Sequence, residues 1–394
     1  HRDLHSFPTR RSSDLGKLLA FMNTTALPVV YTTAHHAVVR VPQGAQTGRI
    51  TLQMANTARR FIFPKPFTVE PREGIEPRNP GLYIAAIDTD DSASNVFLFH
   101  SPSPEGKTAA MTLGADPIDY REIQAIASGD VENTCSYETA LAVARKPYRN
   151  DVPVTAIYFS SDVKNLYFGN AKRIFGFSHY RNVNSLTIAP FWGDKIYDLI
   201  YSVENHEENR VFVYLKISSM PRDIPLFSVP LTAKLRLLQP VDFQGNQRSE
   251  LSLVYQDKEL WHLGILKNFQ NFTPVVVYKG KAEITATASG DMDGDGKQEL
   301  YFATYQNGQA TLYVRMWNGE QKLLFTRQDM GAIFAIALAD LNKDGKEELI
   351  CSFHKKFTST VYYSADALKI GLPGCLVLYQ KNNWKVTAMA RTRF

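Results

Sequence analysis

Residues 290–304, GDMDGDGKQELYFAT, combine alternating acidic side chains with a glycine and a following apolar run. Alternate side chains of a tight loop can point to the same side, so hard oxygen atoms can surround one cation there. The predicted ligands are the side chains of Asp291, Asp293, Asp295 and Glu299 and the backbone carbonyl of Lys297. Gly296 suits the sharp turn between them. An all-oxygen set favours Ca²⁺ over transition metals, which prefer His or Cys.

This loop differs from an EF-hand, which needs a bidentate Glu at its twelfth position and a helix on each side. The twelfth residue from Asp291 is Phe302, inside a run typical of a β-strand. We therefore expect the loop to join two strands. A solvated Asp-Gly turn without an ion is the alternative. Against it, three carboxylates on one short loop repel one another unless a cation lies among them.

The same order of residues returns once clearly and several times weakly along the chain. The second loop, ADLNKDGKEEL at 339–349, predicts ligands at Asp340, Asn342, Asp344 and Glu348 and at the carbonyl of Lys346. Glu250, Glu299 and Glu348 follow one another at intervals of 49 residues. Weaker copies with fewer acidic residues contain Asp242, Asp194 with Asp198, Asp130 and Asp88.

A period near fifty residues with about four short strands per unit is typical of a β-propeller. Six such units are visible between residue 82 and the last residue, and a seventh stays open. The predicted fold class is therefore all-β, a six- or seven-bladed propeller of four-stranded blades. Sustained helical periodicity is absent, and no apolar run is long enough for a transmembrane helix.

The two acidic loops with their following strands resemble the FG-GAP/VCBS repeat, the propeller unit of integrin α-subunits and many bacterial surface proteins. The resemblance is strong over the last two units and weak over the first four. It implies Ca²⁺ at the two loops and a secreted or cell-surface protein. The last ligand of each loop, called the closing ligand below, is Glu299 or Glu348, whereas the family more often has Asp at this position. Plain hairpins are expected for the upstream loops, in which amides or other residues replace the acids.

Four segments are expected along the chain. Residues 1–15 resemble the translation of a sequencing adapter and are excluded from the fold. Residues 16–70 contain short alternating strands, and VPQGAQTGRITLQ followed by PFTVEP resembles the closing half of an IPT/TIG domain, a partial immunoglobulin-like β-sandwich. Residues 71–80 carry three prolines and predict a stiff linker. Residues 81–394 form the predicted propeller.

The propeller face opposite the Ca²⁺ loops is the expected ligand surface. Residues 354–374 are interpreted as a long loop there, rich in aromatic and basic side chains, as exposed binding surfaces are. The candidate ligand-binding residues are Lys355, Lys356, Phe357, Tyr362 and Tyr363. The expected partner is a protein or a glycan. A packed insertion without a ligand is the alternative.

Three functions remain open from the sequence. A non-enzymatic binding or adhesion module is favoured, because the motif of such repeats is present and no linear catalytic motif occurs, although an active site in a propeller channel would leave no linear motif. The alternatives are a lectin-like propeller and a polysaccharide lyase or hydrolase with a site at the channel mouth. The net charge of +5 is dispersed, which argues against nucleic acid as a partner. A disulfide between Cys351 and Cys375 is possible, since both fall on what are read as neighbouring strands.

Overall fold

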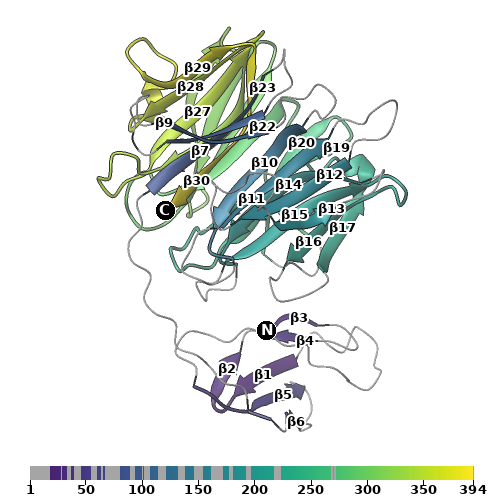
Figure 1. Cartoon of the computed structure of the whole chain (residues 1–394). Coiled ribbons are helices and arrows are strands. Elements are labelled where there is room, and N and C mark those ends of the chain that lie inside the picture. Colours follow the sequence, from purple (N-terminus) through teal and green to yellow (C-terminus); the bar gives the residue numbers. More distant parts are fainter. Residues whose placement is uncertain are drawn as a thin grey trace. The chain divides into compact units, whose positions relative to one another are not determined.

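The computed structural model describes residues 18–27, 29–32, 37–39, 46–54, 60–63, 65–66, 80–88, 94–99, 101, 107–113, 121–131, 138–145, 154–160, 172–176, 181–191, 197–216, 223–267, 269 and 272–393. Nearly all regular structure in these residues is β-strand (Figure 1). The exceptions are two 3₁₀ turns, η4 (Leu231–Ala233) and η5 (Ala367–Lys369). Contacts divide the chain into two compact units, one within His1–Glu76 and one comprising Pro77–Lys216 and Asp223–Phe394.

The first unit is built from two antiparallel sheets. A four-stranded sheet has the order β2-β1-β5-β6, with β1 at Leu18–Met22, β2 at Thr25–Leu27, β5 at Ile50–Met54 and β6 at Arg60–Ile62. A two-stranded sheet joins β3 (Val29–Thr32) to β4 (Ala37–Val39). Ala20, Met22 and Leu52 are buried in this unit. Residues 67–71 of the segment PFTVEP lie outside the described residues.

The second unit contains six four-stranded antiparallel sheets among its described residues. Five of them follow the chain strictly, each strand pairing with the next. The first two of these sheets consist of β10 (Arg121–Gly129), β11 (Glu138–Arg145), β12 (Val154–Ser160) and β13 (Lys172–Gly176), and of β14 (Arg181–Ala189), β15 (Asp198–Asn205), β16 (Arg210–Lys216) and β17 (Ile224–Pro230). The third consists of β18 (Leu237–Val241), β19 (Glu250–Asp257), β20 (Leu260–Leu266) and β21 (Val275–Gly280). The last two consist of β22 (Glu283–Gly290), β23 (Glu299–Gln306), β24 (Gln309–Arg315) and β25 (Gln321–Gln328), and of β26 (Ala332–Ala339), β27 (Glu348–Lys355), β28 (Thr358–Ser364) and β29 (Leu376–Asn382).

The remaining sheet joins the two ends of the unit. Its order is β30-β7-β8-β9, with β30 at Trp384–Arg393, β7 at Pro80–Asp88, β8 at Ser94–Phe99 and β9 at Lys107–Leu113. Figure 1 shows β30 beside β7, although nearly the whole unit separates them in sequence. The first strands of successive sheets touch in the cyclic order β10, β14, β18, β22, β26, β30 and back to β10. This closed, β-propeller-type arrangement places the connections between strands at its two ends.

The inner strands of the sheets are buried on both faces, because each sheet packs against a sheet on either side, whereas outer strands such as β21 and β25 are largely exposed. In β27, Cys351 and Phe353 belong to a core shared with β22–β25, whereas Ile350 belongs to a core shared with β30 and β7. This division follows from the alternation of side chains along a strand. It also explains why second strands such as ELYFATYQ and ELICSFHK are almost continuously apolar and buried.

The predicted repeat was out of register in its first unit. Asp88 is the last residue of β7, where it pairs with Trp384 of β30, so it follows a second strand and not a first one. Because the C-terminal strand β30 supplies the first strand of this sheet, β7, which contains the apolar residues before Asp88, is its second strand. The Asp88 segment therefore begins at the end of the sheets opposite the two acidic loops.

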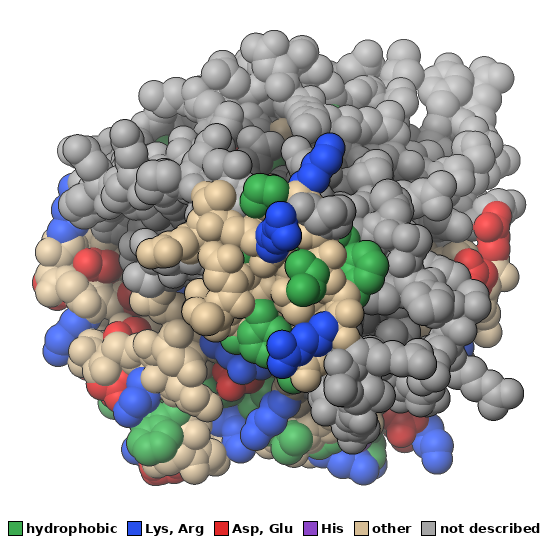
Figure 2. All heavy atoms as spheres, turned by 90° about the horizontal axis from the view of Figure 1, so that it is seen from below, with side chains coloured by type: hydrophobic (Ala, Val, Ile, Leu, Met, Phe, Trp, Pro, Cys, Tyr) green, Lys and Arg blue, Asp and Glu red, His purple; other side chains and the backbone are tan. Residues whose placement is uncertain are grey.

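Charged side chains are interspersed on the described surface. On the face drawn in Figure 2, Lys and Arg side chains lie among acidic and uncharged ones and do not form one continuous basic area. Within the described part of the chain, no helix is long and apolar enough to cross a membrane.

Candidate metal centre

Two loops hold the predicted cation ligands, and both connect the first and second strands of a sheet. The first loop (residues 291–298) joins β22 to β23, and the second loop (residues 340–347) joins β26 to β27. They succeed each other along the chain and belong to neighbouring sheets, since β22 contacts β26. The prediction that each loop joins two strands, as opposed to two helices, is confirmed.

Each loop folds around its first aspartate. The Asp291 carboxylate accepts hydrogen bonds from the N–H groups of Gly294 at 2.8 Å, Asp295 at 3.1 Å and Gly296 at 2.8 Å. The Asp340 carboxylate accepts from Asp344 and Gly345, both at 3.0 Å. These bonds wrap the backbone tightly enough to require the left-handed region at Gly296 and Gly345, where φ is 85° and 89°.

Carboxylate oxygens converge in both loops. One oxygen each of Asp291, Asp293 and Glu299 lie within 4.8 Å of one another, and the same holds for Asp340, Asp344 and Glu348. The other two predicted side-chain ligands lie beside these groups. Asp295 is turned toward Lys297, accepting its N–H at 2.8 Å. Asn342 donates to the Asp344 carboxylate at 3.0 Å.

The lysines whose carbonyls were predicted as ligands follow the loop glycines. Lys297 and Lys346 donate their backbone N–H groups to Asp295 and Asp344, at 2.8 Å and 2.9 Å. The Lys297 ammonium lies 4.3 Å from the centre of the Trp317 ring and forms an ion pair with the Asp295 carboxylate at 3.5 Å. The role of both carbonyl oxygens as ligands stays a prediction.

The closing glutamates are buried, and their burial is the strongest electrostatic feature of the two loops. Glu299 is 4 % exposed and Glu348 is 1 % exposed. Burial raises the pKa of Glu299 to about 7, with the carboxylates of Asp293, Asp291 and Asp295 adding to the effect and the Met292 N–H opposing it. Burial likewise raises the pKa of Glu348. A cation at either cluster would relieve this penalty, because an opposite charge favours the ionised carboxylate.

One oxygen of Glu348 lacks a hydrogen-bond partner. Its Oε2 accepts the Leu341 N–H at 3.1 Å, whereas its Oε1 is buried and has no partner of good geometry among the described residues. The Tyr363 hydroxyl is near enough to lower the pKa of this carboxylate, but burial outweighs its effect. A buried polar atom without a partner is costly. A hard cation would coordinate this oxygen and so supply the partner that it lacks. The residues therefore fit Ca²⁺.

A third loop (residues 242–249), between β18 and β19, repeats the backbone arrangement with fewer charges. The Asp242 carboxylate accepts the N–H groups of Asn246 at 3.2 Å and Gln247 at 2.6 Å. Gln244 and Asn246 stand where the first loop has Asp293 and Asp295, and their amides bond to each other at 3.0 Å. The loop shape therefore depends on its first aspartate, and the later acids determine the charge available to a cation.

The other upstream copies are only partly described. Asp130 and Glu138 are buried at the ends of the connection between β10 and β11, and Asp198 is the first residue of β15. Glu132 and Asp194 lie outside the described residues.

The predicted ligand loop at 354–374 is wrong in its extent. Residues 358–364 form β28, which pairs with β27 on one side and β29 on the other, so only Lys356 and Phe357 connect β27 to β28. Short tight hairpins of this kind need a residue with positive φ, here Lys356 at 54°. Cys351 and Cys375 are both free thiols.

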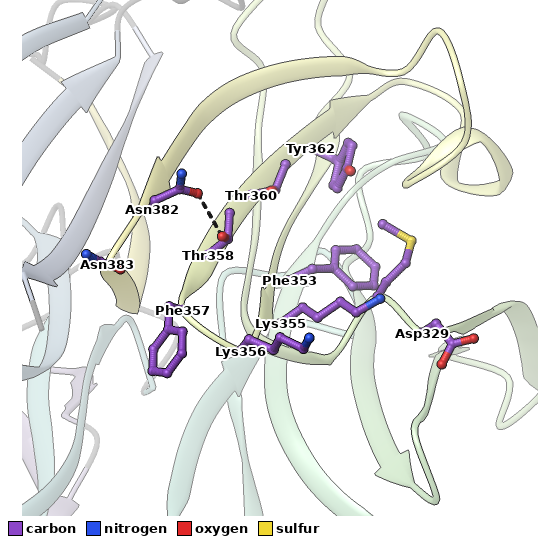
Figure 3. A pocket seen from close by; sticks show the side chains of 11 residues that line it. Asp329, Phe353, Lys355, Lys356, Phe357, Thr358, Thr360, Tyr362, Asn382 and Asn383 are labelled. Carbon is purple, nitrogen blue, oxygen red and sulfur yellow. Dashed lines mark hydrogen bonds between the residues drawn. The ribbon is translucent and has the colours of Figure 1, made fainter.

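Four of the five candidate ligand residues share one cavity. It has a volume of about 670 Å³ and is lined by Lys355, Lys356, Phe357 and Tyr362, by Phe353, Thr358 and Thr360 of the same two strands, by Asp329 and Met330 between β25 and β26, and by Asn382 and Asn383 at the end of β29 (Figure 3). Tyr363 lies on the other face of β28, where burial and then the Glu348 carboxylate raise its pKa. Sequence reasoning missed Asp329, Asn382 and Asn383 because they come from turns distant in the chain.

Residues 291–351 match the model of the FG-GAP-like repeat family. This FG-GAP-like segment contains both acidic loops and the strands between them. No curated protein matches the sequence. Solved structures similar to the chain include TolB from Acinetobacter baumannii, with 11% identity, 89% of this chain and 81% of that chain covered, and a TM-score of 0.49. A quinonprotein alcohol dehydrogenase-like protein from Bacteroides thetaiotaomicron has 11% identity and a TM-score of 0.41. The match covers 94% of this chain and 90% of that chain.

Proposed function

We propose that the second unit is a six-bladed β-propeller whose first and second loops bind Ca²⁺, and that it serves as a non-enzymatic binding or adhesion module. The blade number is supported by the cyclic contacts of the six first strands. Pairing of β30 with β7 closes this cycle with strands from both ends of the unit. A ring closed in this way leaves only short, protected sheet edges, which suits a rigid scaffold.

The observation that carries the Ca²⁺ proposal is the buried Oε1 of Glu348, which has no hydrogen-bond partner of good geometry among the described residues and lies at the edge of a converging carboxylate cluster. In the second loop, Asp340, Asp344 and Glu348 would hold the ion, with the Asn342 oxygen and the Lys346 carbonyl completing the set. In the first loop, Asp291, Asp293 and Glu299 would do so, with Asp295 and the Lys297 carbonyl. The ion supplies positive charge that offsets carboxylate repulsion, and its binding free energy adds to the stability of the folded state.

A location outside the cell agrees with this role. Exposed loops with several partly solvated ligands bind Ca²⁺ weakly, in the range of extracellular modules at roughly 10⁻⁴–10⁻³ M. Such sites fill only where Ca²⁺ is abundant. The ligand partner is proposed to bind at the opposite end of the sheets, where the cavity with exposed basic and aromatic side chains opens. No catalytic group is assigned, because the described residues offer no nucleophile and base in contact within that cavity.

Thermal unfolding of the full chain in Ca²⁺ and in chelator tests the proposal. Each site filled at a hundredfold excess over its dissociation constant adds about 2.7 kcal/mol, which raises the melting temperature by several degrees. Asp344→Asn should reduce the gain, while the matched variant Glu259→Gln, an exposed acid in the β19–β20 turn, should keep it. Equal melting temperatures with Ca²⁺ and chelator would overturn the proposal.

A further inference from the structure

The cavity at the β27–β28 hairpin is bounded by two neighbouring sheets. Phe353, Lys355 and Tyr362 come from the sheet β26–β29, and Asp329 and Met330 come from the connection between β25 and β26. Figure 3 shows Asp329 on the side away from Asn382 and Thr358. Phe353, 2 % exposed, belongs to the core between the two sheets, so the cavity has a rigid apolar base.

The surrounding backbone is held in place by Arg327. Its guanidinium donates to the carbonyl oxygens of Ile370 at 2.9 Å and Leu368 at 2.6 Å, which fastens the segment around η5 to the preceding sheet. Met330, which lines the cavity, packs against Gly371 of the same segment. A cavity whose walls are fixed before binding loses little conformational entropy when a ligand enters.

The charge of the cavity favours an anionic ligand. Lys355 and Lys356 are exposed, and neither ammonium group has an ion-pair partner among the described residues. Asp329 is the one carboxylate among the described lining residues, so cationic groups are in excess there. Lysines bind carboxylates through charge-assisted hydrogen bonds, which are about twice as strong as neutral ones.

The uncharged lining favours a ligand rich in hydroxyl groups. Thr358, Thr360, Asn382 and Asn383 bring hydroxyl and amide groups, which both donate and accept hydrogen bonds as sugar hydroxyls do. Thr358 already donates to Asn382 at 2.8 Å, which orients the amide. The exposed ring of Phe357, 68 % accessible, and the half-buried ring of Tyr362 offer flat apolar surfaces that suit the C–H faces of a sugar ring.

An extended peptide fits the cavity less well. A peptide commonly binds by adding a strand to a free sheet edge. Here β28, which supplies Thr358, Thr360 and Tyr362, is already paired with β27 and with β29. A ligand at this wall can therefore contact side chains but has no backbone ladder to join.

We infer that this cavity binds an acidic oligosaccharide, with Lys355 and Lys356 on its carboxylate groups, Phe357 and Tyr362 against its rings, and the Thr and Asn side chains on its hydroxyls. The inference rests on the proposed function, because it names the ligand class of the face opposite the Ca²⁺ loops. The volume of about 670 Å³ lies within the range of small-molecule sites.

Calorimetric titration of the Ca²⁺-loaded full chain tests the inference. The probes are a galacturonate tetramer, a galactose tetramer of equal length and an acidic peptide of equal charge, each dialysed against the protein's Ca²⁺ buffer. The galacturonate tetramer should bind. The double variant Lys355→Ala/Lys356→Ala should weaken its binding by about tenfold or more, and Phe357→Ala should weaken binding too. The matched control Lys322→Ala, an exposed lysine at the other end of the sheets, should change nothing.

Equal binding of the neutral tetramer, binding of the peptide alone, unchanged affinity in the double lysine variant, or no binding of any probe would each overturn the inference. Melting of each variant with and without Ca²⁺ shows that it is folded. The same melting data separate the two proposals. If Ca²⁺ stabilises the chain and the galacturonate tetramer does not bind, only the ligand class is wrong; if Ca²⁺ has no effect, the proposed function fails on its own.

Discussion

Asp291 and Glu347 form a reciprocal pair of hydrogen bonds between neighbouring sheets. The Asp291 N–H donates to Glu347 Oε2 at 2.9 Å, and the Glu347 N–H donates to the Asp291 carbonyl oxygen at 3.2 Å. Asp291 is the first candidate ligand of the first loop, and Glu347 directly precedes the closing ligand Glu348 of the second loop. Arg391 in turn donates to Glu347 Oε1 at 2.6 Å. The two candidate Ca²⁺ sites are therefore joined through backbone atoms.

The same pairing recurs one sheet earlier. The Asp242 N–H donates to Gln298 Oε1, and the Gln298 N–H donates to the Asp242 carbonyl oxygen, both at 2.9 Å. Between Ser249 and Pro190 only the backbone bond is present, at 2.9 Å. In these three loops, the residue before the final Glu or strand therefore forms a hydrogen bond to the residue that ends the first strand of the preceding sheet or begins its loop. These bonds connect successive sheets at the end that carries the two acidic loops.

Removing the Glu347 side chain should uncouple the two sites. An ion in the first loop orders Asp291, and Asp291 then orders Glu347 and Glu348, so the second ion should bind more tightly than it would alone. In Glu347→Ala, the coupling free energy between the two sites, obtained from the Ca²⁺ binding isotherm, should fall by about 1 kcal/mol. Glu347→Gln, which keeps an acceptor for the Asp291 N–H, should retain most of it. Independent binding in the unmodified chain would contradict this expectation.

Asp291 should stabilise the fold even without a cation. Its carboxylate accepts three backbone N–H groups, whereas Asp293 accepts only the Asp295 N–H, at 3.1 Å. Asp291→Ala should therefore cost about 1–3 kcal/mol in chelator, because it removes three backbone hydrogen bonds of net value about 0.5–1.5 kcal/mol each and water replaces them in part. Asp293→Ala should lower stability mainly in the presence of Ca²⁺. Denaturant unfolding of both variants with and without Ca²⁺ measures the difference; equal losses in chelator would disprove it.

The third loop should be convertible into a Ca²⁺ site. It already has the backbone arrangement of the first loop around Asp242, with Gln247 at a φ of 62° where the first loop has Gly296, and it carries amides at Gln244 and Asn246 in place of acids. The double substitution Gln244→Asp/Asn246→Asp should add one Ca²⁺ to the stoichiometry measured by calorimetry. The control Gln256→Asp, in the neighbouring β19, should leave the stoichiometry as it is. An unchanged ion count in the loop variant would show that the backbone arrangement is not sufficient.

Trp384 should stabilise the closure of the second unit. It is 5 % exposed in β30 and lies 6.1 Å, between ring centres, from Phe97 of β8, which belongs to the same sheet. Trp384→Ala should cost about 3–5 kcal/mol, as expected for a large buried aromatic. Trp317→Ala should cost far less, because Trp317 is 56 % exposed and its contact with Lys297 is worth about 0.5–1 kcal/mol. Chemical denaturation of both variants compares them, and similar losses would argue against the closure.

Much of the local chemistry could be predicted from the sequence. The 49-residue spacing, the oxygen ligands of the first and second loops and the strand that follows each loop depend on residues only a few positions apart. Alternation of apolar residues and the preference of aromatic residues for strands act over the same short range. An all-β chain with two candidate cation loops could thus be inferred without coordinates.

Pairing between distant segments was settled only by the tertiary structure. Asp88 was misplaced because its sheet takes its first strand from Trp384–Arg393, and no local pattern specifies that partner. Tyr362 and Tyr363 are adjacent in sequence but face different neighbouring sheets, so one lines the cavity and the other approaches Glu348. The Asp291–Glu347 pair likewise exists only because two sheets pack side by side. Short-range pattern determines what each segment can form, whereas burial against distant segments decides where each side chain acts.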